Sequence, residues 1–203
     1  MRLQRLSGAI GAASLVATAA LTMAPAATAS TPAAAGWTGS TGMLFSKTLT
    51  NKALRHGVAI IGMDPGGGAL ITSGKLAYSL PVSKVSFDKG FPFVQHYGGI
   101  TLSVGDGYLQ RSVVLKDITL DYKRSKVTAT VFLEEAYSGG GSRESLDTIT
   151  VFTIKDQPSG PSSFPYVFYV SQDLAAAASG HLGWFPKTGT RLGVALTDLN
   201  PPD

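Results

Sequence analysis

The chain has 203 residues, no cysteine and a formal net charge of +4, from 17 Lys and Arg against 13 Asp and Glu. The lack of cysteine excludes disulfides, thiol catalysis, Cys-ligated zinc and iron–sulfur clusters. Two of the positive charges, Arg2 and Arg5, lie at the N-terminus, so the rest of the chain carries only +2. A charge this small does not indicate a nucleic-acid partner.

Residues 1–29 have the three parts of a secretory signal peptide. The two arginines precede an apolar stretch from Gly8 to Met23, and Pro25 and a small-residue triplet follow, which predicts cleavage after Ala29. The apolar stretch is shorter than the roughly 20 residues that a spanning helix needs. We therefore expect a secreted, soluble protein of 174 residues with no transmembrane segment after processing.

The processed chain is predicted to consist of a flexible leader, 30–42, and a single β-rich domain, 43–203. Alternating apolar and polar side chains predict most of its strands, and two stretches have helical spacing. In chain order, the expected elements are a strand at 43–45, a helix at 48–56, a strand at 58–61, a turn at 64–68, strands at 100–104 and 108–115, strands at 118–122 and 127–133 joined by a hairpin at 123–126, a mobile loop at 138–142, strands at 149–154 and 164–170, a helix at 172–179 and a strand at 191–199. Gly57 and Gly180 are expected to follow the ends of the helices. This order predicts a mainly β fold, either an antiparallel β-sandwich or a partly closed barrel with two short helices.

No catalytic motif is present. The sequence lacks a Gly-x-Ser-x-Gly elbow, a His-Glu-x-x-His pair, an EF-hand loop and a phosphate-binding glycine loop. The three histidines, His56, His96 and His181, are far apart, so their spacing indicates no metal site. Adjacent Glu134 and Glu135 would face opposite sides of a strand and are interpreted as surface charge.

One segment, 91–102, combines a histidine, a tyrosine and two glycines, His96, Tyr97, Gly98 and Gly99. Imidazole and phenolate are both ligands of haem iron. As neighbours on a strand, His96 and Tyr97 would face opposite ways, so at most one could serve a given pocket directly. The alternative is that His96 makes a local hydrogen bond and the glycines form a bulge.

Five short motifs follow one another within residues 43–199: ALRHGV, YSLPVSKVSF, VQHYGGITLS, VVLKDITLDYKRSKVTATV and LAAAASG. In this order they resemble exported actinobacterial proteins related to the HtaA domain, a domain of secreted or surface-anchored haem-uptake proteins. The resemblance implies a β-rich fold with two small helices.

The resemblance also implies residues for a haem site. In haem-binding members, a tyrosine near the start of the domain ligates iron, and the histidine of a His-x-Gly-x-Leu-x-Leu pattern supports it. Residues 96–102 are similar to that pattern, but no tyrosine lies between Trp37 and His56. Tyr78, the first tyrosine of the chain, and Tyr97 and Tyr108 are the candidate replacements.

The sequence therefore favours a non-catalytic exported domain that binds an unidentified extracellular ligand or cell-surface component. Its candidate ligand-binding residues are His96, Tyr97, Tyr78 and Tyr108, and no catalytic residue or metal site is predicted. The second hypothesis is an extracellular haem-binding protein using His96. The third is a secreted hydrolase with His96 or His181 as its base.

Overall fold

A computed structural model of the chain describes residues 36–65, 70–72, 75–105, 108–155 and 162–202. The predicted signal peptide and its cleavage site lie outside the described residues, as do 30–35 of the predicted leader and 66–68 of the predicted turn. Within the described ranges, no helix is long and apolar enough to cross a membrane.

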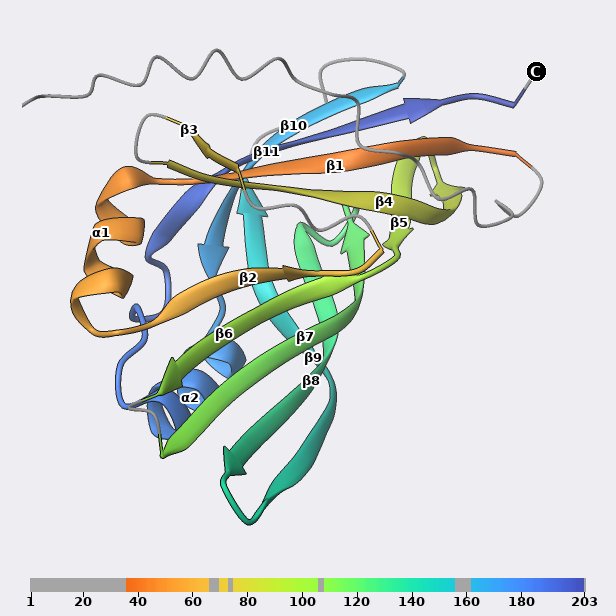
Figure 1. Cartoon of the computed structure of the whole chain (residues 1–203). Helices are drawn as coiled ribbons and strands as arrows, with labels where there is room; N and C mark the ends of the chain where they lie inside the picture. Colours follow the sequence, from red (N-terminus) through yellow and green to blue (C-terminus); the bar gives the residue numbers. More distant parts are fainter. Residues whose placement is uncertain (1–35, 66–69, 73–74, 106–107, 156–161, 203) are drawn as a thin grey trace, which may run out of the picture.

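The fold is mainly β with two short helices, which confirms the predicted fold class (Figure 1). The elements are β1 (Thr38–Phe45), α1 (Lys47–Arg55), β2 (Ala59–Met63), β3 (Leu70–Thr72), β4 (Lys75–Asp88), β5 (Phe91–His96), β6 (Gly99–Gly105), β7 (Leu109–Asp121), β8 (Lys126–Tyr137), β9 (Gly140–Lys155), β10 (Ser163–Val170), α2 (Gln172–Leu182) and β11 (Arg191–Asn200).

Ten strands form one antiparallel path in the order β2-β6-β7-β5-β4-β1-β11-β10-β9-β8. A further pairing of β8 with β7 closes the strands from β7 to β8 into a ring. The length of β7 makes this possible, because its first part pairs with β6 and its last part with β5. Between the two predicted alternatives, the structure is therefore the partly closed barrel.

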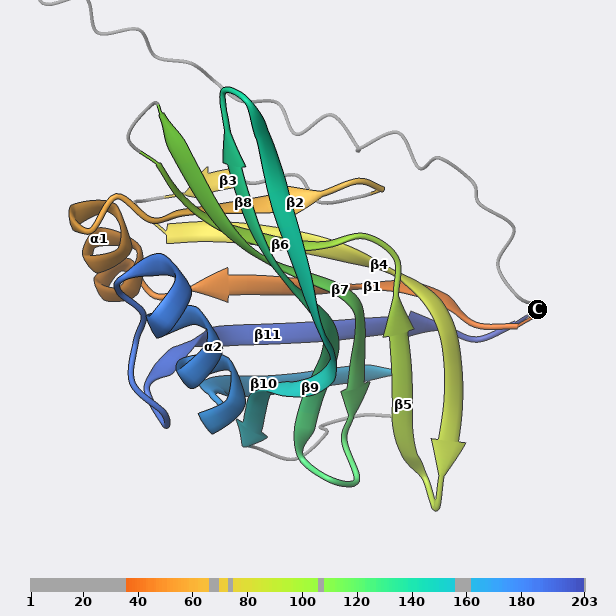
Figure 2. The same ribbon diagram turned by 90° about the horizontal axis from the view of Figure 1, so that it is seen from below.

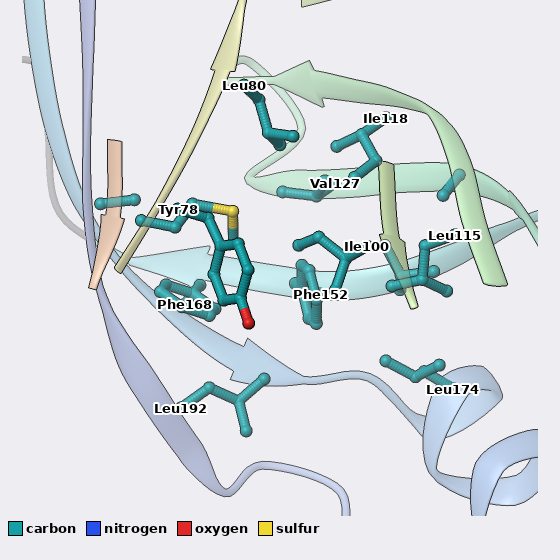
Figure 3. Packing of buried hydrophobic residues seen from close by; sticks show 14 of the residues in the cluster. Tyr78, Leu80, Ile100, Leu115, Ile118, Val127, Phe152, Phe168, Leu174 and Leu192 are labelled. Carbon is teal, nitrogen blue, oxygen red and sulfur yellow. The ribbon is translucent and has the colours of Figure 1, made fainter. Parts of the chain in front are cut away.

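The inside of the ring is filled by side chains that alternate along the strands. In β10, Phe164, Tyr166, Phe168 and Val170 are buried, and the residues between them are half-buried. Burial of a large apolar side chain stabilises a fold by roughly 1.5–3 kcal/mol. Figure 3 shows Phe168 among the other labelled core side chains, and its ring packs edge-on against Phe45 at 5.3 Å between centroids.

Helix α1 follows its predicted limits closely. The hydroxyl of Ser46 accepts a hydrogen bond from the backbone N–H of Leu49 at 3.2 Å and so caps the first turn. Leu49 and Ala53 are the buried side of the helix. Gly57 adopts the left-handed conformation just beyond the end, with a φ of 70°, as its position predicts.

Helix α2 extends further than predicted. It continues through Gly180 to Leu182, and the left-handed residue at its end is Gly183, with a φ of 74°. Leu182 is buried on the same side as Leu174 and Ala178. Burial of Leu182 outweighs the roughly 1 kcal/mol that a glycine inside a helix costs.

Two segments that were predicted as flexible belong to paired structure. Strand β1 begins at Thr38, inside the predicted leader, and pairs with β11 on one side and β4 on the other. Its small residues allow this close approach, since a side chain at Gly39 would collide with the backbone of Asp198. The loop predicted at 138–142 is a tight turn, because β8 ends at Tyr137 and β9 begins at Gly140.

Candidate functional site

His96 lies at the end of β5, sealed inside the ring with 5% of its surface exposed. Its Nδ1 is 2.9 Å from the carbonyl oxygen of Ile118, and its Nε2 is 2.7 Å from Oγ1 of Thr41. A carbonyl can only accept, so Nδ1 carries the proton and Nε2 accepts from the Thr41 hydroxyl. The Thr41 oxygen lies 2.7 Å from that of Thr197. These bonds link strands β5, β7, β1 and β11.

The alternative interpretation expected a local hydrogen bond for His96, but its hydrogen bonds reach distant residues. Thr41 is 55 residues away in the sequence. The glycines after His96 do not form the bulge that this interpretation expected. Gly98 lies in the turn that leads to β6 and has a φ of 77°. A side chain at Gly98 would meet the carbonyl oxygen of Met63 at 2.7 Å, so glycine is required by the close approach of β2.

Burial keeps His96 neutral. It lowers the pKa from 6.5 to about 4, and the bond to the Ile118 carbonyl acts in the opposite direction. Both ring nitrogens are engaged, and the ring is closed off from solvent. In this state His96 is placed to hold strands together rather than to accept protons from a substrate or to bind iron.

The three candidate tyrosines lie in different environments. Tyr78 is buried in β4, and its hydroxyl donates to the carbonyl oxygen of Ile60 in β2. Tyr97 lies in the turn between β5 and β6 and is half-buried, whereas Tyr108 is 84% exposed just before β7. The structure therefore places the four candidate residues in separate surroundings instead of gathering them in one pocket.

Tyr78 is a poor match to an iron ligand. Figure 3 shows its side chain directed into the apolar core, and its ring packs edge-on against Phe45 at 5.7 Å between centroids. Burial raises the pKa of its hydroxyl well above the ordinary value of 10.0. A tyrosine that ligates iron does so as phenolate, and this environment favours the protonated phenol.

The residues considered for hydrolysis contact other partners in the described part of the chain. His181 contacts the backbone carbonyl of Glu134 through Nε2 at 2.9 Å, and the partners of His96 are a threonine and a carbonyl. Glu134 and Glu135 form surface ion pairs with Arg143 and Arg111, as expected of surface charge. Across the described ranges, no cluster of His, Asp and Glu is suited to a metal ion.

A groove of about 660 Å³ lies between α1 and the segment that joins α2 to β11. Lys52, Arg55 and His56 line the α1 side. The opposite side contains residues 184–187, and Arg191 lies at the start of β11. Figure 2 shows α1 beside the chain that leaves α2 and enters β11. Small-molecule sites in proteins have volumes of roughly 300–1,000 Å³, so the groove falls in this range.

Both walls of the groove are held by backbone hydrogen bonds. The N–H of Ser46, which precedes α1, donates to the carbonyl of Leu192 at 2.8 Å. On the other side, the N–H of Gly189 donates to the carbonyl of Val170 at 2.8 Å. The rings of His56 and Trp184 stack in parallel at 4.5 Å and join the two walls. The groove is therefore preorganised.

The charge of the groove is unbalanced. Lys52, Arg55, Lys187 and Arg191 line it without any acidic side chain. Among the described residues, none of these four forms an ion pair, and the salt bridges present involve other cations. A concave surface lined by one sign of charge concentrates counter-ions, so this groove attracts anions.

The underside of the groove is apolar and closely packed. A cavity of about 20 Å³ lies below it and shares Leu49, Trp184, Phe185 and Pro186 with the groove. That volume holds about one water molecule. A ligand in the groove would therefore lie along its walls and not enter the ring.

The groove was not predicted from the sequence. A signal was present in two stretches without any acidic residue, 36–63 and 174–197. The first contributes Lys52 and Arg55, and the second contributes Lys187 and Arg191. Their convergence depends on the pairing of β1 with β11, which joins distant parts of the chain.

Comparison with solved structures supports the fold expected from the HtaA resemblance. The C-terminal domain of HtaA from Corynebacterium glutamicum is similar with a TM-score of 0.50 and 12% identity, over 81% of this chain and 99% of that one. Heme-binding protein HtaB from the same organism has a TM-score of 0.51 and 11% identity, over 83% and 95%. At these identities the likeness concerns the fold alone. No protein-family model and no curated protein sequence matches the chain.

Proposed function

We propose that this chain is an exported, non-catalytic binding domain that holds an extracellular ligand in the groove between α1 and residues 184–191. The groove carries the proposal, because it combines a suitable volume, fixed walls and four cations without ion-pair partners among the described residues. Export rests on the signal-peptide pattern of residues 1–29. The engagement of His96 with backbone and threonine favours binding over catalysis.

Haem is a second candidate, because HtaB, which has this fold, is a heme-binding protein. The residues expected to bind iron fit poorly here: His96 is sealed with both nitrogens engaged, and Tyr78 donates its hydroxyl hydrogen to Ile60. Haemin titration of the processed chain tests this candidate. A new Soret band that disappears in His96→Gln would support it, and a spectrum equal to free haemin plus protein would exclude it.

The proposal itself is tested by mapping where small ligands bind. The ¹⁵N-labelled processed chain is titrated with a set of aromatic and aliphatic fragments of positive, neutral and negative charge. We expect saturable amide shifts concentrated at residues 46–56 and 184–191. The proposal fails if no fragment moves these amides, or if the shifts concentrate around His96.

A further inference from the structure

The groove also contains information about the kind of ligand that it takes. We propose that it binds a flat aromatic organic anion, with its acidic group against the cations and its ring along the aromatic wall. This inference rests on the proposed function and specifies the ligand of that site.

The charge of the ligand follows from the lining. Lys52 and Arg55 project from one wall, and Lys187 and Arg191 belong to the other side, so an acidic group in the groove meets cations from both sides. The stretches that build the two walls contain no acid to compete for these cations. At physiological salt the Debye length is about 8 Å, so charges around one groove act on a ligand together.

The flat ring follows from the apolar part of the lining. Trp184 and Phe185 are half-buried and line the groove together with the cations. Trp184 already stacks on the ring of His56 with an angle of 8° between the planes. Aromatic rings gain from offset stacking and edge contacts beyond simple burial, which favours a flat partner on this wall.

The small cavity under the groove distinguishes an aromatic acid from a fatty acid. A long acyl chain needs an apolar tunnel, and the described core below the groove leaves only about 20 Å³. An aromatic ring can instead lie along the open wall without entering this cavity. The geometry therefore favours a compact ring with an acidic substituent over an extended chain.

The test compares four probes that differ in one property each: 2-naphthoate, neutral 2-naphthylmethanol, cationic 2-naphthylmethylamine and decanoate. Binding to the processed chain is measured by tryptophan fluorescence and by amide shifts. We expect 2-naphthoate to bind at least about tenfold more tightly than the neutral and cationic analogues, because only the anion gains charge-assisted contacts. Its affinity should fall when sodium chloride is raised to about 0.5 M, because salt screens the exposed cations.

Variants locate the effect. The double variant Arg55→Gln/Lys187→Gln should weaken 2-naphthoate by about tenfold, since each exposed ion pair contributes up to about fivefold. The matched control Lys84→Gln/Lys89→Gln removes the same charge from exposed lysines of β4 and its turn, outside the groove, and should change affinity less than twofold. Urea unfolding of both double variants verifies that they fold.

The outcomes separate the two proposals. If neutral 2-naphthylmethanol or decanoate shifts the groove amides as strongly as 2-naphthoate, the ligand class is wrong and the binding groove stands. If the control variant weakens 2-naphthoate binding as much as the groove variant does, the net charge of the protein attracts the anion. The proposed ligand class is then also wrong. If none of the probes shifts the groove amides, both the ligand class and the proposed function are wrong.

Discussion

The sealed interior around His96 and the groove beside α1 are both polar, but they satisfy their polar groups in opposite ways. Inside the ring, His96, Thr41 and Thr197 form one connected set of hydrogen bonds. Among the described residues, no buried side-chain nitrogen or oxygen lacks a partner. In the groove, four cations line one surface, and none of them forms an ion pair with another described residue.

This difference follows from the cost of burial. An unpaired polar group in an apolar interior costs about 1–3 kcal/mol, so a fold retains buried polar residues when they bond to one another. An exposed cation keeps its water and needs no partner. A conspicuous buried histidine is thus compatible with a purely structural role, whereas unbalanced charge on fixed walls is available to a ligand.

Acidification should have the largest effect on the free energy of unfolding, because it favours protonation of His96, which is neutral in the interior. The pKa of His96 is about 4 in the folded chain and 6.5 without burial, so between these values the unfolded chain binds more protons. The stabilisation that neutral, buried His96 provides is complete above pH 6.5 and is lost as the pH falls towards 4. The free energy of unfolding should fall by about 3 kcal/mol in total. Urea unfolding at pH 7 and pH 4.5 measures it.

The variant His96→Gln isolates this contribution from that of the carboxylates. It should be less stable than the original chain at pH 7, and its free energy of unfolding should change less between pH 7 and pH 4.5. Parallel losses in the two proteins would show that His96 is not the titrating group.

Thr41→Val should have the next largest effect. Valine keeps the shape of threonine but removes the donor to His96 Nε2 and the partner of the Thr197 hydroxyl. We expect a loss of about 2 kcal/mol in the free energy of unfolding. The matched control, Thr153→Val on an exposed position of β9, should change it by less than about 0.5 kcal/mol. Equal effects of the two substitutions would contradict the buried network.

Two glycines lie around the end of α2, where the groove wall begins. Replacing each of them by alanine should change the stability of the chain in opposite directions. Gly183→Ala forces alanine into a left-handed conformation and should destabilise the chain by about 1 kcal/mol. Gly180→Ala lies inside the helix, where an added Cβ would meet no atom within 4 Å, and should stabilise by about 0.5–1 kcal/mol. Thermal unfolding of both variants checks this, and a reversed order would place the helix end at Gly180.

The groove cations should have the smallest effect on stability. Arg55→Gln/Lys187→Gln removes two exposed charges that form no ion pair with the described residues, so the free energy of unfolding should stay within about 0.5 kcal/mol. Chemical unfolding at pH 7 measures it. A loss of more than 1 kcal/mol would mean that these cations hold the fold together.

Local patterns were enough to predict much of the fold. The alternation in Phe164–Val170 gave a strand, and Gly57 correctly marked the end of α1. The small residues at the start of β1 were predicted as a flexible leader, but Gly39 instead allows the close approach of β11. The end of α2 was also misplaced, because only the buried contacts of Leu182 distinguish Gly183 from Gly180.

The sites were harder to predict because they depend on contacts between distant residues. His96 was predicted as a ligand-binding candidate, but its partner Thr41 lies 55 residues earlier in the sequence and could not be identified from it. The groove needs α1 and the 184–191 segment to be brought together by the pairing of β1 with β11. Neither arrangement leaves a spacing that a motif search can detect.

The binding of an aromatic anion in the groove can be observed in a crystal structure of the processed protein soaked with 2-naphthoate. We expect electron density for the probe between Arg55 and Trp184, with His96 still bonded to Thr41 and Ile118. Density for the probe beside a displaced His96, with nothing between α1 and residues 184–187, would contradict it.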